Sequence, residues 1–150
     1  MTRKLGIIVL CTGNSCRSQM AEAFVRHKWA HVMEAQSAGT HPAAIIQPET
    51  IACMKEKGIT VDGQFPKPVR ALNWKNVDLL VNMSGAPVFA LIPKYKGGSL
   101  MWNVKDPIGQ SPKVYREVRD QIGVLLDRLA QTLQKQSPSH KQDAEKAPGR

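Results

Sequence analysis

Residues 5–18 read LGIIVLCTGNSCRS, and this stretch decides the fold. Its first six residues form a continuous apolar run, which is typical of a strand buried on both faces of a parallel sheet. From Ser18 to about Ala30, apolar residues such as Met20 and Phe24 recur among charged ones at helical spacing, which predicts a helix. A strand that enters a helix through a short loop is the repeating unit of α/β folds.

The rest of the chain continues this alternation. Three further apolar segments are predicted to be strands, over residues 33–38, 77–83 and 99–104. Two further helices are predicted, one from Pro48 to Lys57 with Gly58 as its C-terminal stop, and one that begins just after Pro112. The last helix has the clearest pattern, because six apolar residues recur on one face at three- and four-residue steps: Val114, Val118, Ile122, Leu125, Leu129 and Leu133. We therefore expect an α/β protein with a parallel sheet.

Length and composition set the broad class. A chain of 150 residues with 42% hydrophobic residues is expected to form one globular domain, which we place at residues 1–134. Residues 135–150 offer almost no apolar side chains and are predicted to be a disordered basic tail. No apolar run approaches the roughly 20 residues of a membrane span, and the N-terminal run is too short for a signal peptide. Three cysteines, an odd number, argue against a disulfide framework and favour the reducing cytoplasm.

The distribution of charge and of histidines bears on whether the protein binds nucleic acid or a metal ion. A formal net charge of +9 permits nucleic-acid binding but equally suits an enzyme that attracts anions. Lysine and arginine are spread along the chain with no recognition-helix motif and no aromatic cluster beside them, so no nucleic-acid partner is expected. The four histidines are scattered away from the cysteines, so no metal site is predicted.

The loop between the first strand and the first helix has the features of an oxyanion site. A short loop bent around an anion turns its backbone N–H groups inward, and the N-terminus of the following helix adds a positive dipole end. A glycine and an asparagine in the loop tolerate the backbone angles that such a bend requires. The predicted oxyanion-binding residues are Thr12, Gly13, Asn14, Ser15, Cys16 and Arg17.

Within this loop, Cys11 is the candidate nucleophile. The positive field of the helix end and of Arg17 favours a thiolate, and the planar guanidinium can hold two oxygens of a phosphate-like group. Ser18 is placed to donate a hydrogen bond to the sulfur. Cys16 has two interpretations, a partner for Cys11 in a reversible disulfide or a small side chain packed behind the loop. The alternative for the whole loop, a buried structural thiol and a surface arginine, does not account for its place between strand and helix.

A reaction that displaces oxygen from phosphorus or arsenic also needs an acid for the leaving group. Asp106 follows a predicted strand and therefore lies at the same sheet edge as Cys11. An Asp-Pro pair is equally typical of a simple turn, and spacing does not choose between the two interpretations.

Taken together, the N-terminal Cys-x5-Arg-Ser loop and the late Asp106-Pro107 pair resemble the low-molecular-weight protein tyrosine phosphatase superfamily, which includes the thioredoxin-coupled arsenate reductases. The resemblance spans about residues 4–134. It implies a three-layer fold in which helices flank a four-stranded parallel sheet. It also implies roles for five residues: nucleophile for Cys11, oxyanion clamp for Arg17, general acid for Asp106, and supports for Asn14 and Ser18.

Several segments are more similar to the arsenate reductase branch. Gln19 stands where the phosphatases usually carry proline, and residues 37–39, 54–56 and 106–109 also look like that branch. The phosphatases usually place an aromatic residue after Asp-Pro to stack on the substrate ring. Ile108 offers no such face, which implies a small inorganic anion as substrate.

One departure bears on how a reductase cycle would end. The arsenate reductases of this branch use two more cysteines, whereas this chain has none after Cys53 and carries Met83 at the first of these positions. A thioether cannot attack a Cys11–arsenic adduct, so the resemblance implies an external thiol such as glutathione, with a glutaredoxin- or thioredoxin-like donor and no bound cofactor. Attack of Cys16 on the Cys11–arsenic adduct would require a strained geometry, because the two cysteines are only five residues apart. Hydrolysis of a Cys11 phosphoenzyme needs no second thiol, so a tyrosine phosphatase acting on phosphomonoesters is the alternative function.

Some arsenate reductases of this type bind potassium near the loop, and Asn14, Glu22 and Ser37 match the positions involved. An aspartate that belongs to this potassium site in the family is replaced in this chain near Lys67. The Lys67 ammonium can substitute for the charge of the potassium ion. A solvated loop lysine is the other interpretation, and no metal is predicted.

Overall fold

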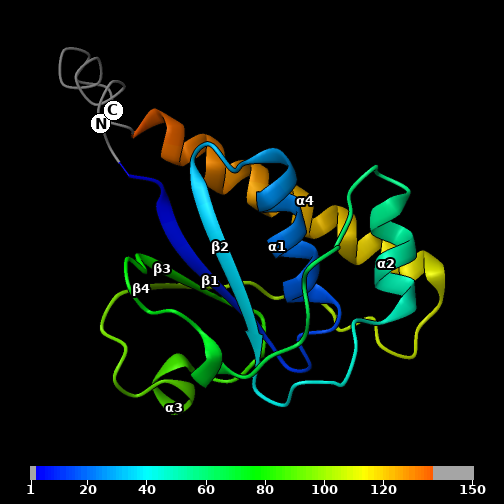
Figure 1. Cartoon of the computed structure of the whole chain (residues 1–150), viewed down its shortest axis with the longest axis horizontal. Coiled ribbons are helices and arrows are strands. Elements are labelled where there is room, and N and C mark those ends of the chain that lie inside the picture. Colours follow the sequence, from blue (N-terminus) through cyan, green and yellow to red (C-terminus); the bar gives the residue numbers. More distant parts are fainter. Residues whose placement is uncertain (1–2, 137–150) are drawn as a thin grey trace.

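The computed structural model describes residues 3–136 and contains one parallel sheet with helices on both faces (Figure 1). The strands pair in the order β2-β1-β3-β4, and all three pairings are parallel. Their bounds are Leu5–Cys11 for β1, Met33–Gly39 for β2, Leu79–Asn82 for β3 and Gly98–Met101 for β4. The predicted α/β fold with a four-stranded parallel sheet is therefore confirmed.

The helices form the two outer layers. One layer holds the three longer helices, which are α1 (Arg17–Lys28), α2 (Pro48–Lys55) and α4 (Pro112–Lys135). The other layer is thinner and contains a 3₁₀ turn, η1 (Val69–Ala71), and a short helix, α3 (Val88–Leu91). These two short elements were not predicted, because neither is long enough to show a helical period.

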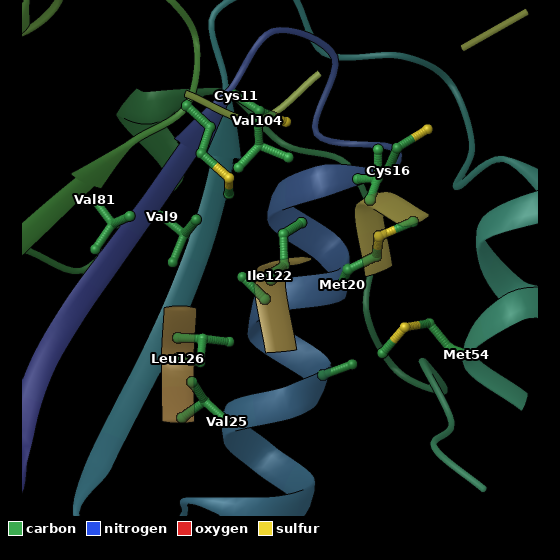
Figure 2. Packing of buried hydrophobic residues seen from close by; sticks show 14 of the residues in the cluster. Val9, Cys11, Cys16, Met20, Val25, Met54, Val81, Val104, Ile122 and Leu126 are labelled. Carbon is green, nitrogen blue, oxygen red and sulfur yellow. The ribbon is translucent and has the colours of Figure 1, made fainter. Parts of the chain in front are cut away.

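The side chains of β1 alternate between two hydrophobic cores, as the two-residue period of a strand requires. Ile7 and Val9 belong to the larger core under α1, α2 and α4, and Figure 2 shows the side chain of Ile122 between those of Val9 and Met20 in this core. Ile8 and Leu10 belong to a smaller core on the opposite face, together with Leu72, Leu80 and Ala38. Both faces of β1 are buried, which explains why its sequence is continuously apolar.

Some predicted boundaries were wrong by a few residues. The segment predicted as a strand over 99–104 ends as a strand at Met101, because its partner β3 ends at Asn82 and offers no further ladder. α1 ends at Lys28 and not near Ala30, and α2 ends at Lys55 and not at Lys57. Gly58 lies three residues beyond the end of α2 with φ of 72°, in agreement with its predicted role as a stop. Lys135, placed in the predicted tail, belongs to α4, and residues 137–150 lie outside the described residues.

The sheet order places the predicted loop where the direction of the chain connections reverses. From β1 the chain passes to β2 on one side, and later returns to β3 on the other side of β1. Ligands of open α/β sheets bind where strand order reverses in this way, at the carboxyl ends of the strands. Gly39 at the end of β2 lies against the loop, since a Cβ there would be 2.6 Å from the Thr12 carbonyl oxygen and 2.9 Å from the Asn14 nitrogen. A side chain at this position would displace the loop.

Candidate active site

The loop after β1 turns its carbonyl oxygens outward. Five consecutive carbonyls, from Cys11 to Ser15, accept hydrogen bonds at 2.8–3.1 Å from Thr40 N, His41 N, Ala43 N, Gln19 Nε2 and Gln47 N. Within residues 3–136, by contrast, the backbone N–H groups of residues 13–16 have no acceptor. Asn14 adopts a φ of 52°, the left-handed conformation that permits the bend. The result is a run of consecutive free N–H donors, which is the kind of backbone arrangement that binds anions.

The N-terminus of α1 points its free donors to the same place. No side chain caps this helix end, and its first turn contains no acidic residue. The partial positive charge of the helix end is therefore not neutralised locally and favours an anion in the loop. Arg17, the first residue of α1, adds a full positive charge.

The Cys11 thiol lies at the end of a chain of buried polar side chains. Its Sγ is 2.8 Å from Ser18 Oγ, and Ser18 Oγ accepts a hydrogen bond from Asn14 Nδ2 at 2.6 Å. Asn14 Nδ2 also donates to Ser37 Oγ at 3.0 Å, and Ser37 Oγ donates to Glu22 Oε1 at 2.6 Å. Asn14, Ser18 and Ser37 are fully buried. This network fixes the loop and gives the sulfur a hydroxyl neighbour, Ser18 Oγ.

The guanidinium of Arg17 is anchored by two other strand ends. Its Nη1 donates to the carbonyl oxygens of Met83 at 2.6 Å and Val104 at 3.1 Å, which follow β3 and β4. The side chain is only 8% exposed, so its position is set by these contacts and not by solvent. Nη1 is therefore bound to the protein, while Nε and Nη2 donate no hydrogen bond within the described residues and can donate to an oxyanion.

Asp106 lies beside Arg17, on the loop between β4 and α4. Its Oδ2 is 3.6 Å from Arg17 Nη2, and its side chain is 45% exposed. Its Oδ1 accepts the backbone N–H of Ile108 at 3.1 Å, so the Asp-Pro turn is also present. The two interpretations left open by the sequence are thus compatible, since one oxygen serves the turn and the other faces the site. Ile108 is 45% exposed and provides an aliphatic edge beside it.

The other thiols lie in the core on the helical side of the sheet. All three cysteines are free, and Cys16 Sγ lies 3.7 Å from the hydroxyl oxygen of Tyr115 on α4. Burial raises the pKa of Cys16 and raises that of Cys53 to about 11. Both are therefore expected to be protonated near neutral pH and to be weak nucleophiles. Met83 is buried just beyond β3, with its backbone N–H bonded to Leu10.

Some features of the site were not anticipated from the sequence. The main-chain oxygens that hold Arg17 and the hydroxyl of Tyr115 near Cys16 carry no local sequence signal, because they come from segments 66 to 99 residues away. Gln64 is another such feature, because its amide donates to Gln19 Oε1 at 2.7 Å and so ties the segment before Lys67 to α1. Gln19 itself donates to the carbonyl oxygens of Asn14 and Phe65, at 2.9 and 3.0 Å.

Two further observations concern membranes and metal ions. No helix within residues 3–136 is both long and apolar enough to cross a membrane. In the same part of the chain, no three histidine, cysteine, aspartate or glutamate residues gather to hold a metal ion.

Comparison with known proteins identifies relatives of two kinds. The glutaredoxin arsenate reductase of Synechocystis is 34% identical over 125 residues, which cover 82% of this chain and 94% of that protein. A solved arsenate reductase in the phosphate-binding state has a TM-score of 0.76 at 30% identity and covers 86% of this chain and 98% of its own. The YwlE arginine phosphatase of Geobacillus stearothermophilus has a TM-score of 0.78 at 27% identity, covering 91% of this chain and 97% of its own.

The family assignment rests on most of the chain. Residues 6–139 match the family described as low molecular weight phosphotyrosine protein phosphatase. This match confirms the resemblance carried by the Cys11–Ser18 loop and the late Asp-Pro pair. The chain belongs to the low-molecular-weight phosphotyrosine protein phosphatase family.

Proposed function

We propose that this protein is an arsenate reductase in which Cys11 attacks arsenate and an external thiol completes the reduction. The observation that carries the proposal is the loop itself: within residues 3–136 the N–H groups of residues 13–16 have no acceptor, and the loop begins at Cys11 and ends at the anchored Arg17. The relative from Synechocystis, a glutaredoxin arsenate reductase, supports this substrate and this type of thiol donor. The aliphatic Ile108 at the rim suits a small anion, because it offers no ring for an aryl group to stack on.

The proposed first step joins sulfur to arsenic. The Cys11 thiolate attacks arsenate bound by the loop and Arg17, and Asp106 gives its proton to the departing oxygen, which leaves as water. A thiolate from outside then attacks Cys11 Sγ. The electron pair of the S–As bond leaves with arsenic, which departs as arsenite, and Cys11 remains in a mixed disulfide. A second thiol restores the Cys11 thiolate and carries the disulfide away, so two thiols are oxidised for each arsenate reduced.

The resolving thiol is proposed to be external because of where the other sulfurs lie. Cys16 is buried against Tyr115, and Cys53 is a buried thiol with a raised pKa. Met83 has no thiol to offer. A small thiol of the cytoplasm, such as glutathione, with a glutaredoxin- or thioredoxin-like protein to recycle it, fits this arrangement.

The test is arsenate-dependent turnover with defined donors. Arsenite production is measured with glutathione alone, with glutathione and glutaredoxin, and with thioredoxin and its reductase. Turnover is expected with glutathione and glutaredoxin, to be abolished in Cys11→Ser and to persist in the matched control Cys53→Ser. A folded protein that forms no arsenite with any of the three donor systems would exclude this function.

A phosphatase is the second candidate, favoured by the contact between Asp106 and Arg17. A carboxyl group at this place can protonate the leaving oxygen of a phosphomonoester, and a water molecule can then hydrolyse the Cys11 phosphoenzyme without any second thiol. Hydrolysis of an aryl phosphate at mildly acidic pH measures this activity. If phosphomonoesters are the substrate, Ile108→Tyr should raise kcat/KM for aryl phosphates several-fold by adding a ring to stack on, and Asp106→Asn should abolish hydrolysis.

A further inference from the structure

The polar network behind the loop has a direction, which follows from which atoms can donate. Glu22 accepts the hydroxyl proton of Ser37, so the oxygen of Ser37 is left to accept from Asn14. The side-chain oxygen of Asn14 accepts the backbone N–H of Lys67 at 2.9 Å, which fixes the amide with its N–H groups toward Ser37 and Ser18. Ser18 therefore accepts from Asn14, and its own proton is free to point to the sulfur of Cys11.

The carboxylate of Glu22 sets this direction but carries an electrostatic cost. Its side chain is only 13% exposed, so water screens its charge poorly. A negative charge behind the loop opposes a thiolate at Cys11 and also opposes a bound oxyanion. Without a nearby cation, Glu22 would orient the hydrogen bonds toward Cys11 but its own negative charge would destabilise the Cys11 thiolate.

Lys67 supplies a cation at this place. Its Nζ lies 3.9 Å from Glu22 Oε1, donates to the Phe65 carbonyl oxygen at 3.2 Å and lies 4.8 Å from the centre of the Phe65 ring. The side chain is only 14% exposed, which argues against a solvated loop lysine. Its backbone is held as well, since the Lys67 carbonyl accepts the N–H of Gly39 at 2.9 Å. The ammonium is thus fixed by both main-chain and side-chain contacts.

We infer that Lys67 is a positioning residue for the nucleophile: its ammonium neutralises Glu22, so that Glu22 can orient the Ser37–Asn14–Ser18 hydrogen bonds without opposing negative charge on Cys11 and its substrate. The inference deepens the proposed function, since it rests on Cys11 acting as the nucleophile. It does not depend on whether the oxyanion is arsenate or a phosphomonoester, because both need the thiolate.

The experiment measures the Cys11 thiolate directly and needs no turnover. Thiolate absorbance at 240 nm is followed against pH for each variant, and the same variant carrying Cys11→Ser is subtracted to remove the other thiols. Lys67→Met removes the charge and keeps the length, Lys67→Arg keeps the charge, and Lys67→Gln replaces Lys67→Met if the latter does not fold. Lys75→Met is the matched control, because it removes one exposed lysine elsewhere on the chain.

The expected result is a shift in one variant and not in the controls. Removing one charge that acts on Cys11 from behind the loop, in a partly screened site, corresponds to about 0.5 to 1 pH unit. Lys67→Met should therefore raise the midpoint of the Cys11 thiolate titration by about that amount. Below the midpoint, kcat/KM should fall by the same factor, about 3- to 10-fold, with the loss shrinking at higher pH. Lys67→Arg and Lys75→Met should stay close to the unmodified protein.

A double variant separates charge neutralisation from mere packing. If Lys67 acts through Glu22, adding Glu22→Gln to Lys67→Met should bring the titration midpoint most of the way back, because the unneutralised charge is gone. If Lys67 only fills space, the titration midpoint of the double variant should be raised at least as far as that of Lys67→Met. That additive result, or a midpoint in Lys67→Met within about 0.2 pH unit of the unmodified protein, overturns the inference. Neither outcome depends on arsenate or phosphate turnover, so the proposed function is tested separately.

Discussion

Replacing Arg17 with lysine keeps the positive charge at the site but removes the fork. In the structure, Nη1 is committed to the carbonyl oxygens of Met83 and Val104, whereas Nε and Nη2 donate no hydrogen bond within residues 3–136, although Nη2 lies 3.6 Å from Asp106 Oδ2. A lysine ammonium at this buried position can contact the strand-end carbonyls or the oxyanion, but its compact head cannot span both. Arg17→Lys therefore separates charge from geometry.

The size of the effect follows from the hydrogen bonds lost. A hydrogen bond to a charged group contributes about 1.5–3 kcal/mol, so the loss of two bonds to the oxyanion costs about 3–6 kcal/mol in the transition state. This corresponds to a decrease in kcat/KM of about 10²- to 10⁴-fold. The free energy of unfolding should fall by much less, about 1.5–3 kcal/mol, through the loss of one strand-end contact. A domain with ordinary stability, about 5–15 kcal/mol, remains folded after this loss.

The assay compares kcat/KM for arsenate with glutathione and glutaredoxin, and kcat/KM for an aryl phosphate, in Arg17→Lys and in Arg128→Lys. Arg128 is an exposed residue of α4 and serves as the matched control, which should keep full activity. Urea unfolding reports stability in parallel. The reasoning is refuted if Arg17→Lys keeps more than about a tenth of kcat/KM in the active reaction while remaining folded, since charge alone would then suffice.

Three further predictions concern the rest of the molecule. Cys16→Ala should keep arsenate turnover within about twofold when glutathione and glutaredoxin are supplied, because the resolving thiol is external, and a loss beyond about tenfold would show that Cys16 takes part in resolution. Two arginines of α4 lower the pKa of Glu56 from 4.5 to about 2, so its contribution to stability is present above pH 4.5 and is lost as pH falls toward 2. The urea midpoint of unfolding, measured from pH 6 to pH 3, should therefore fall less steeply with pH in Glu56→Gln than in the unmodified protein. Parallel plots of midpoint against pH for the two proteins would contradict this role. Ile122→Ala should lower the free energy of unfolding by about 2–5 kcal/mol because its side chain is fully buried in the larger core, whereas Val124→Ala, at 48% exposure, should change it by less than about 1 kcal/mol.

The elements that the sequence predicted well are those with a long, regular period. β1 and α4 were recognised because an unbroken apolar run and a repeated three- and four-residue step each leave a clear pattern. β4 was placed too far along the chain because its extent depends on β3, the strand that it pairs with. The 3₁₀ turn and α3 were missed because such short elements are stabilised by their contacts and not by their own period.

The candidate site divides in the same way. Cys11, Arg17 and Ser18 lie within eight residues of one another, so the strand, the loop and the helix that bring them together are encoded locally. The role of Asp106 could not be decided from spacing alone, since an Asp-Pro pair is equally typical of a turn. Only the folded structure places its second carboxylate oxygen 3.6 Å from Arg17 Nη2. The residues that orient the loop from behind come from β2 and from the segment that ends at Lys67.

The sequence by itself determined the class of fold, the loop predicted to bind an oxyanion and the thiol with which that loop begins. These depend on backbone preferences and periodicity, which act between residues close together in the chain. Tertiary structure decided what stands around that loop: the carbonyls of Met83 and Val104 that hold Arg17, and the pairing of Glu22 with Lys67. Those contacts join segments 45 to 87 residues apart, and they form only because the sheet order brings the ends of separate strands to one edge.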